Sequence, residues 1–189
     1  MSGLGGRGRL LVFALLVLLQ AVAVVGLVVR EENLRANGRE ILLKAAPVDP
    51  RDLLRGDYVI LRYEVQDVPL YSRDYSGSPS EPAPGNEVYV TLRHDGRYWT
   101  PASYWQVSSD SLPPEPGVVF LRGTVTNVSR TTAMLRVSYP NLERYYVPEG
   151  TGNLPKPPDV AVLVDASGNA RIQRVEIDGK PWPTPTPAR

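Results

Sequence analysis

The sequence predicts an all-β fold, a small sandwich or barrel-like domain of short antiparallel strands, preceded by one N-terminal transmembrane helix. Three observations support this prediction. Residues 10–29 form an apolar run of 20 residues without a charge, and about 20 such residues are needed to cross the hydrocarbon core of a bilayer. Beyond residue 56, no stretch keeps a helical period over about ten residues. Short apolar stretches alternate there with Gly-, Pro- and Asp-containing turns, as in sandwiches and barrels.

The position of the apolar run divides the N-terminal part of the chain into three segments. We expect residues 1–9 to be a short cytoplasmic tail, residues 10–29 the transmembrane helix, and residues 30–38 a juxtamembrane helix or linker. Arg7 and Arg9 precede the run and favour an N-terminus inside the cell, and a long domain translocates largely regardless of the charges that follow. A cleavable signal peptide is the alternative, with Ala21-Val22-Ala23 as its cleavage site. The apolar run continues six residues past Ala23, which favours a retained anchor.

Gln20 lies at the middle of the apolar run and is its only polar residue. Hydrocarbon cannot satisfy a primary amide. The position therefore predicts a contact with a neighbouring helix, either from a second copy of the chain or from a partner membrane protein. A tolerated polar residue close to a signal-peptide cleavage site is the simpler interpretation.

The remaining chain is expected to form a β domain over residues 39–180, outside the cytoplasm, followed by a Pro-rich disordered tail over residues 181–189. Turn residues and alternating patterns predict strands at residues 39–46, 58–65, 87–93, 97–100, 117–128, 131–139, 144–147, 160–164 and 170–177. The sequence His94-Asp95-Gly96-Arg97 predicts a hairpin turn, since an Asp-Gly pair suits positive φ. Residues 66–86 and 150–159 are rich in proline and glycine, and we expect them to be loops.

Residues 47–65, PVDPRDLLRGDYVILRYEV, lead from a turn into an alternating strand. Asp49 suits a helix N-cap, and Gly56 suits the left-handed residue that ends a single helical turn. Alternation then places one set of side chains on a common face of the strand, which we expect to be the core face: Val59, Leu61, Tyr63 and Val65.

The segment Gly56-Asp57-Tyr58-x-x-Leu61-x-Tyr63 matches in full the signature of the GDYXXLXY protein family, a bacterial family that this chain resembles. The resemblance extends over essentially the whole chain, although only this first motif is specific. It implies a membrane-anchored domain that lies outside the cytoplasm, in the periplasm or at the cell surface. Because no biochemical activity is established for that family, the resemblance implies no catalytic residues, and we expect the signature to be mainly structural.

Composition excludes several classes of function. Lys and Arg total 21 against 20 Asp and Glu, so no basic excess points to a nucleic-acid partner. The chain has no cysteine, which excludes disulfides, thiolate catalysis and Cys-ligated zinc. Its only histidine is His94, which falls at the predicted hairpin turn, where a solvated side chain is expected. We therefore expect no cofactor and no resident metal.

Three carboxylates, Asp49, Asp52 and Asp57, fall within nine residues. They could hold a hard cation or act as acid and base in a hydrolase. Calcium takes about six to eight oxygen ligands, however, and the spacing is not that of a calcium loop. Turn chemistry is the favoured interpretation: we expect Asp57 to accept hydrogen bonds at the strand entrance and to bind no metal.

Aromatic residues gather between positions 71 and 105, as Tyr71, Tyr75, Tyr98, Trp99, Tyr104 and Trp105. Such rings suit a binding surface, although ordinary packing within a β domain is favoured. The sequence thus predicts a non-enzymatic accessory or binding subunit of a membrane or envelope complex. A hydrolase with the Asp49, Asp52 and Asp57 site is one alternative, and a purely structural envelope protein is another.

Overall fold

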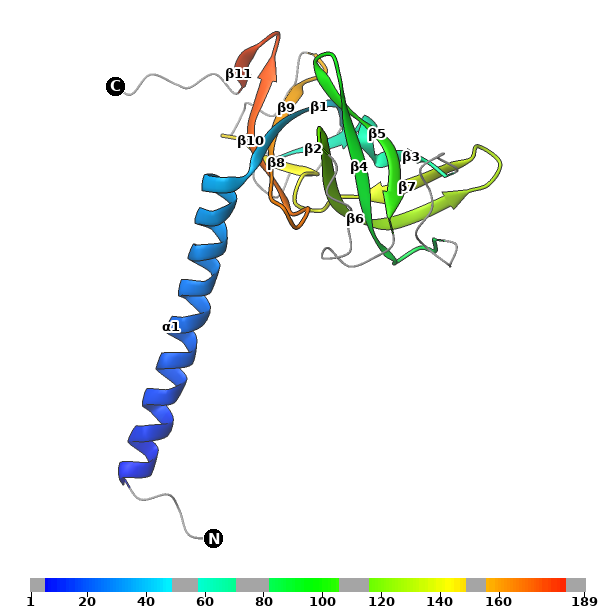
Figure 1. Ribbon diagram of the computed structural model, residues 1–189. Helices are drawn as coiled ribbons and strands as arrows, with labels where there is room; N and C mark the ends of the chain where they lie inside the picture. The colour runs from blue at the N-terminus through cyan, green and yellow to red at the C-terminus, as the bar shows by residue number, and fades with distance from the viewer. Residues whose placement is uncertain (1–5, 49–57, 71–81, 106–115, 149–155, 183–189) are drawn as a thin grey trace. The chain divides into compact units, whose positions relative to one another are not determined.

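The computed structural model describes residues 6–48, 58–70, 82–105, 116–148 and 156–182. The chain divides into two compact units, residues 1–38 and residues 39–189. The first unit contains one helix, and the second is an all-β domain (Figure 1). This architecture confirms the predicted fold class.

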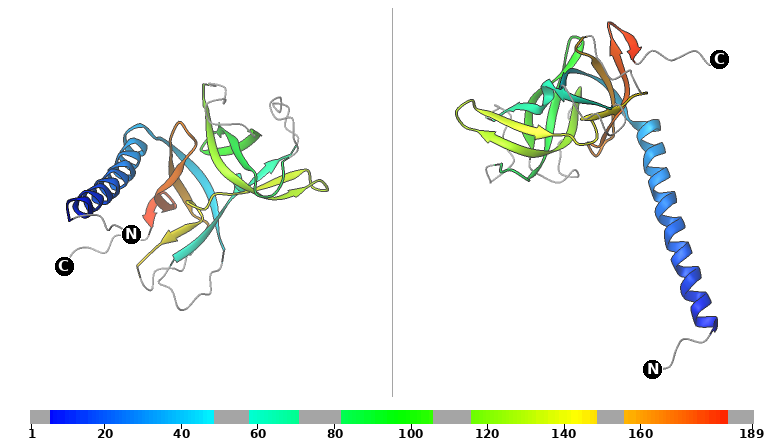
Figure 2. Two further views of the ribbon diagram at one scale, coloured as in Figure 1. Left: turned by 90° about the horizontal axis from the view of Figure 1, so that it is seen from below. Right: turned by 180° about the vertical axis from the view of Figure 1, so that it is seen from behind.

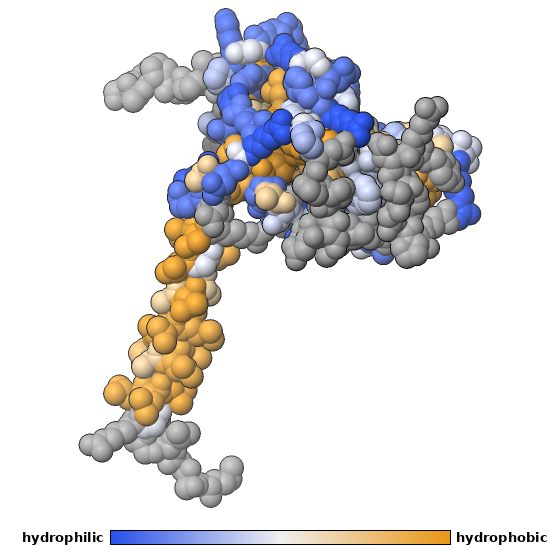
Figure 3. Space-filling view, in the orientation of Figure 1, coloured by the Kyte–Doolittle hydropathy of each residue, from blue (hydrophilic) through white to orange (hydrophobic). Residues whose placement is uncertain are grey.

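The first unit is built around α1, which spans Gly6–Asn37. The helix begins four residues before the apolar run and continues through residues 30–37, so part of the expected tail and most of the expected linker are helical. The side chains of residues 10–29 are all exposed, and hydrophobic residues cover most of the helix face that is visible in Figure 3. The segment Leu10–Asn37 is long and apolar enough to span a membrane.

The helix ends at Asn37, and the glycine that follows is needed because it has no side chain. The Gly38 N–H donates to the carbonyl oxygen of Leu34 at 2.9 Å, and Gly38 is not among the described glycines with positive φ. A Cβ at position 38 would clash with that same oxygen. The close approach of the backbone to Leu34 therefore excludes a side chain at this position.

The described strands of the β domain form two antiparallel sheets. The first has six strands in the order β11-β10-β9-β1-β2-β8. Their bounds are β1 Arg39–Val48, β2 Tyr58–Tyr63, β8 Arg144–Tyr146, β9 Asp159–Val164, β10 Ala170–Ile177 and β11 Lys180–Trp182. The rings of Tyr145 in β8 and Trp182 in β11 have centroids 6.4 Å apart. Because these strands form the two edges of the sheet, the sheet must curl strongly.

The second sheet has five strands in the order β3-β7-β6-β4-β5. Their bounds are β3 Asp67–Pro69, β4 Glu87–Asp95, β5 Tyr98–Trp105, β6 Val118–Ser129 and β7 Met134–Ser138. The edge strands β3 and β5 contact each other, so this sheet also closes on itself in a barrel-like manner. The β6–β7 hairpin extends away from the rest of the domain (Figures 1 and 2).

One hydrophobic core joins the two sheets. It includes Ile41 and Leu43 from β1, Leu92 from β4, Leu121 from β6 and Val162 from β9, each at most 1% exposed. The alternation of core-facing and outward-facing side chains explains how the strands build this core, because β1 and β2 bury every second side chain. Polar contacts also link the sheets: the Arg122 N–H donates to the Gly168 carbonyl oxygen at 2.9 Å.

Several segments differ from the sequence prediction. The signature strand ends at Tyr63, and Val65 is buried from the short 3₁₀ helix η1, Glu64–Gln66. Strand β3 lies within the segment expected to be a loop, and β11 takes up the first two residues of the expected tail, Pro181 and Trp182. Both strands contain proline at a sheet edge, where its missing N–H donor is tolerated.

The predicted hairpin at His94–Arg97 is present, with a shifted turn. Asp95 pairs with Tyr98, so the two-residue loop is Gly96-Arg97 rather than Asp95-Gly96. Only Gly96 has positive φ, at 63°. Glycine at the first central position is typical of a type II′ turn, whose twist matches that of the flanking strands.

Candidate functional site: the signature strand and the Glu143 cluster

The signature strand β2 lies inside the first sheet, between β1 and β8. Leu61 and Tyr63 point to the core and are each 1% exposed, as predicted. Tyr58 faces the other way and is half-buried. Gly56 and Asp57 lie outside the described residues, so the predictions made for them stay predictions. Two of the three described signature residues, Leu61 and Tyr63, therefore pack the core.

Tyr63 also forms a polar contact at the end of β2. Its hydroxyl donates a 2.7 Å hydrogen bond to the carbonyl oxygen of Leu142, in the loop between β7 and β8. Burial raises the pKa of the Tyr63 hydroxyl well above its ordinary value, and the negative charge of Glu143 raises it further. Tyr63 is therefore held neutral, as a hydrogen-bond donor that attaches this loop to the signature strand.

Glu143 is the centre of the polar contacts around this loop. Its Oε1 atom accepts hydrogen bonds from Gln66 Nε2 at 2.9 Å, Ser138 Oγ at 2.7 Å and the Tyr139 N–H at 3.0 Å. Gln66 in turn accepts a hydrogen bond from the Tyr63 N–H at 3.1 Å. We call Tyr63, Gln66, Ser138, Tyr139 and Glu143 the Glu143 cluster.

The geometry of the Glu143 cluster suits a structural role. Three donors converge on one carboxylate oxygen. They occupy the directions in which that oxygen could accept a proton or bind a metal. Among the described residues, no group of three His, Asp or Glu side chains is placed to hold a metal ion. The cluster instead connects residues that are more than 70 positions apart in the chain.

Tyr139 extends this connection into the second sheet. Its buried hydroxyl donates to the Val65 carbonyl oxygen at 3.0 Å, and burial raises its pKa. The ring lies against Gly123 of β6, where a Cβ would come within 2.7 Å of it. Neither Tyr139 nor Glu143 lies in a sequence motif that predicts this role. The glycine inside a predicted strand was the one available signal, since it often marks the close approach of another group.

The two buried tyrosines predict a loss of stability at high pH. Their folded pKa values are raised, whereas an unfolded tyrosine ionises at about pH 10. Their contribution is thus fully present below about pH 10 and is lost as the pH rises further, by up to about 1.4 kcal/mol per pH unit for each. Tyr139→Phe should reduce the slope of unfolding free energy against pH in this range. The exposed Tyr146→Phe is the control, and equal slopes in both variants would contradict the assignment.

Of the other candidate catalytic or metal-binding residues, the structure describes only His94. Asp49, Asp52 and Asp57 lie outside the described residues, so the carboxylate interpretation is not tested. His94 is exposed at the end of β4, with its ring 5.4 Å from that of Trp99 in an edge-on arrangement. This is the solvated hairpin position expected from the sequence.

The described aromatic residues mostly pack inside the domain. Trp99 and Tyr104 are 6% and 3% exposed. Trp105 is half-buried and donates from Nε1 to Thr91 Oγ1 at 3.1 Å, and the Tyr98 hydroxyl donates to Asp159 at 3.0 Å. These four rings therefore serve packing and internal hydrogen bonds. Tyr71 and Tyr75 lie outside the described residues.

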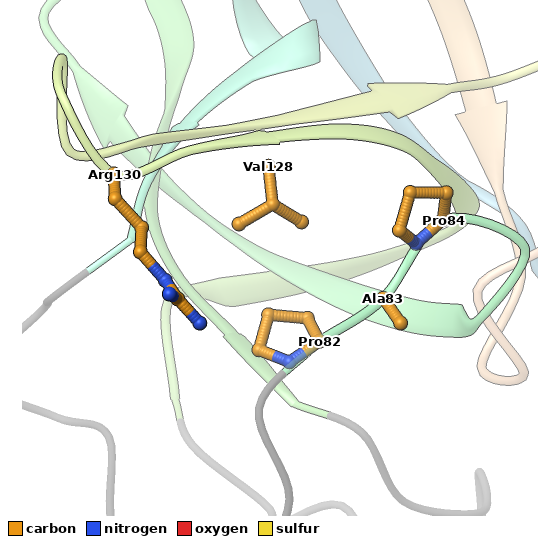
Figure 4. Close-up of a pocket in the computed structure, with 5 residues that line it drawn as sticks. All are labelled: Pro82, Ala83, Pro84, Val128 and Arg130. Carbon is orange, nitrogen blue, oxygen red and sulfur yellow. The ribbon is translucent and has the colours of Figure 1, made fainter.

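An open pocket lies beside the β6–β7 hairpin (Figure 4). Its volume is about 510 Å³, and its described lining comprises Pro82, Ala83, Pro84, Val128 and Arg130. This lining is mainly apolar, with one cationic side chain and no carboxylate or imidazole. Among the described lining residues, nothing could act as a general base or a nucleophile.

A pair of tyrosines marks the edge of the first sheet. Tyr146 of the edge strand β8 is 74% exposed, and it is the one described large hydrophobic residue outside α1 that exposes its side chain so fully. Its ring lies 6.2 Å from that of Tyr58, the third residue of the signature. The signature strand thus contributes one side chain to an exposed aromatic edge.

Comparison with known proteins identifies the family. No curated protein and no solved structure gave a significant match. The family model described as the GDYXXLXY protein matches residues 20–175, which is more than half of the chain and includes β2 and the Glu143 cluster. The chain therefore belongs to the GDYXXLXY protein family.

Proposed function

We propose that this protein is a membrane-anchored accessory or binding subunit, non-enzymatic, whose β domain lies outside the cytoplasm in a membrane or envelope complex. The observation that supports this most is α1, in which residues 10–29 carry no charge and expose every side chain. So large an apolar surface is unfavourable in water unless lipid or protein covers it. Its length suits a bilayer.

The best-connected polar groups that the structure describes in the domain are engaged in internal contacts. Glu143 has three donors on one oxygen. The two most buried tyrosine hydroxyls donate to backbone carbonyl oxygens. These groups are engaged in holding the fold. No observation among the described residues favours the hydrolase alternative.

The exposed edge formed by Tyr58 and Tyr146 is the surface that we assign to a protein partner. Edge strands present backbone groups to which another chain can add, and tyrosine is enriched at protein interfaces because one side chain offers both apolar area and a hydroxyl. The partner would be another membrane protein or an envelope component. A bound partner would cover the ring of Tyr146, which the domain leaves 74% exposed.

Co-purification tests this proposal. Tagged full-length protein should sediment with membranes, resist extraction by alkaline carbonate, and retain a partner in mild detergent. Tyr146→Ala should reduce the recovered partner about tenfold or more, as expected for an aromatic interface residue. The thermal unfolding midpoint should change little, because Tyr146 packs against few groups of its own domain.

The matched control is Thr131→Ala, at an exposed position in the β6–β7 turn of the other sheet. It should leave partner recovery unchanged. Release of the protein by alkaline carbonate would refute the anchor. Equal recovery with Tyr146→Ala and wild type would refute the assigned surface, and hydrolysis of an envelope component by the purified protein would favour the enzyme alternative.

A further inference from the structure

We propose that α1 pairs in parallel with the α1 of a second copy of this chain, along the face that carries Phe13, Gln20 and Leu27. This inference rests on the proposed anchoring of α1 in a membrane. It goes further by naming the occupant of that helix face.

The argument starts from the amide of Gln20. This side chain is exposed on α1, and it is the one polar side chain among residues 10–29. Along the helix it lies about 15 Å from either end of the run. A glutamine side chain is too short to reach the polar interface from there, so its donor and acceptor groups must find a partner inside the hydrocarbon.

The spacing around Gln20 indicates which face is covered. Phe13 and Leu27 lie seven residues before and after it, and each exposes about two-thirds of its side chain, 66% and 67%. At about 100° per residue, both fall within about 20° of the direction of Gln20. Since every other residue of the run is apolar, the amide of Gln20 is what distinguishes this face. One polar position on a seven-residue spacing can fix the register of a helix pair that winds left-handedly.

A second copy satisfies this arrangement without any further requirement. Copies of one chain enter the membrane in the same direction, so their Gln20 side chains lie at the same depth. A primary amide has both donors and an acceptor, and two amides related by a twofold axis can therefore satisfy each other. A different partner would need a polar group of its own at that depth.

Cysteine cross-linking tests the inference directly, because the chain contains no cysteine. Phe13→Cys and Leu27→Cys place a thiol on the proposed face, whereas Leu11→Cys and Val29→Cys place one at similar depth but about 180° away from Gln20. Full-length variants in membranes should form disulfide-linked dimers much faster from the first pair than from the second.

The role of the amide is tested in the same background. Gln20→Leu, combined with Leu27→Cys, should weaken dimerisation in membranes about three- to thirtyfold, and Gln20→Asn should retain most of it. Equal cross-linking on both faces, or no effect of Gln20→Leu, would overturn the pairing. A cross-link to a different protein would overturn the choice of a second copy. Extraction by alkaline carbonate reports on the anchor separately, and release of the protein would overturn the anchor and the pairing together.

Discussion

Replacing Leu61 by alanine is expected to lower the free energy of unfolding by about 2–5 kcal/mol. Leu61 lies in the middle of the signature strand, is 1% exposed and belongs to the core shared by both sheets. Truncation removes its apolar contacts and leaves a cavity, because strands β1 and β8 on either side restrict how far the site can collapse. Denaturant unfolding of the full-length protein in mild detergent measures the change.

The control for Leu61 is Ile60→Ala on the same strand. Ile60 points to the opposite face and is only half-buried, so its truncation should cost clearly less. Similar losses in the two variants would show that the strand has no distinct core face. A small loss at Leu61 would mean that the signature leucine is kept for something other than packing.

Replacing Gly123 by alanine is expected to lower the free energy of unfolding by about 1–3 kcal/mol. The added Cβ would lie 2.7 Å from the ring of Tyr139, and it would also come too close to Val137 Cγ1. Both neighbours are buried, at 2% and 0% exposure, so neither can move away without disturbing β7 or the Tyr139–Val65 hydrogen bond.

A double-mutant cycle separates this clash from a general preference for glycine. Val137→Ala removes one of the atoms that the new methyl group would meet, although it destabilises the protein by itself. The double variant Gly123→Ala with Val137→Ala should then lose less stability than the sum of the two single changes. Additive losses would place the cost of Gly123→Ala elsewhere than in this contact.

Most of the fold follows from local patterns. The 20-residue apolar run predicted α1, and alternation with turn residues predicted nine of the strand regions that the structure contains. Alternation also placed Leu61 and Tyr63 in the core, because a strand puts successive side chains on opposite faces whatever its partners are. The two strands that the pattern missed, β3 and β11, have three residues each and contain proline, so they carry no local signal for a strand.

The Glu143 cluster and the exposed tyrosine edge could not be predicted in the same way. In the sequence, Glu143 is simply one charged residue before a short strand. Its three donors are Ser138 in β7, Tyr139 just after β7, and Gln66 in η1. Likewise, Tyr145 and Tyr146 are neighbours in the sequence, yet one packs towards the core and the other is exposed. Which of two adjacent tyrosines faces outward depends on how the sheet curls.

The sequence by itself determined the apolar helix, the β class of the domain, the core face of the signature strand and the family to which the chain belongs. Each of these depends on residue type and on the spacing of near neighbours, which the chain carries without folding. Only the tertiary structure decided that the signature tyrosine attaches the β7–β8 loop, that Gly123 makes room for Tyr139, and that Tyr58 lies beside Tyr146. The two tyrosine contacts, Tyr63 with Leu142 and Tyr58 with Tyr146, join residues 79 and 88 positions apart, and the Gly123–Tyr139 contact crosses the β6–β7 hairpin. No local pattern encodes which distant residues meet when two sheets curl around one core.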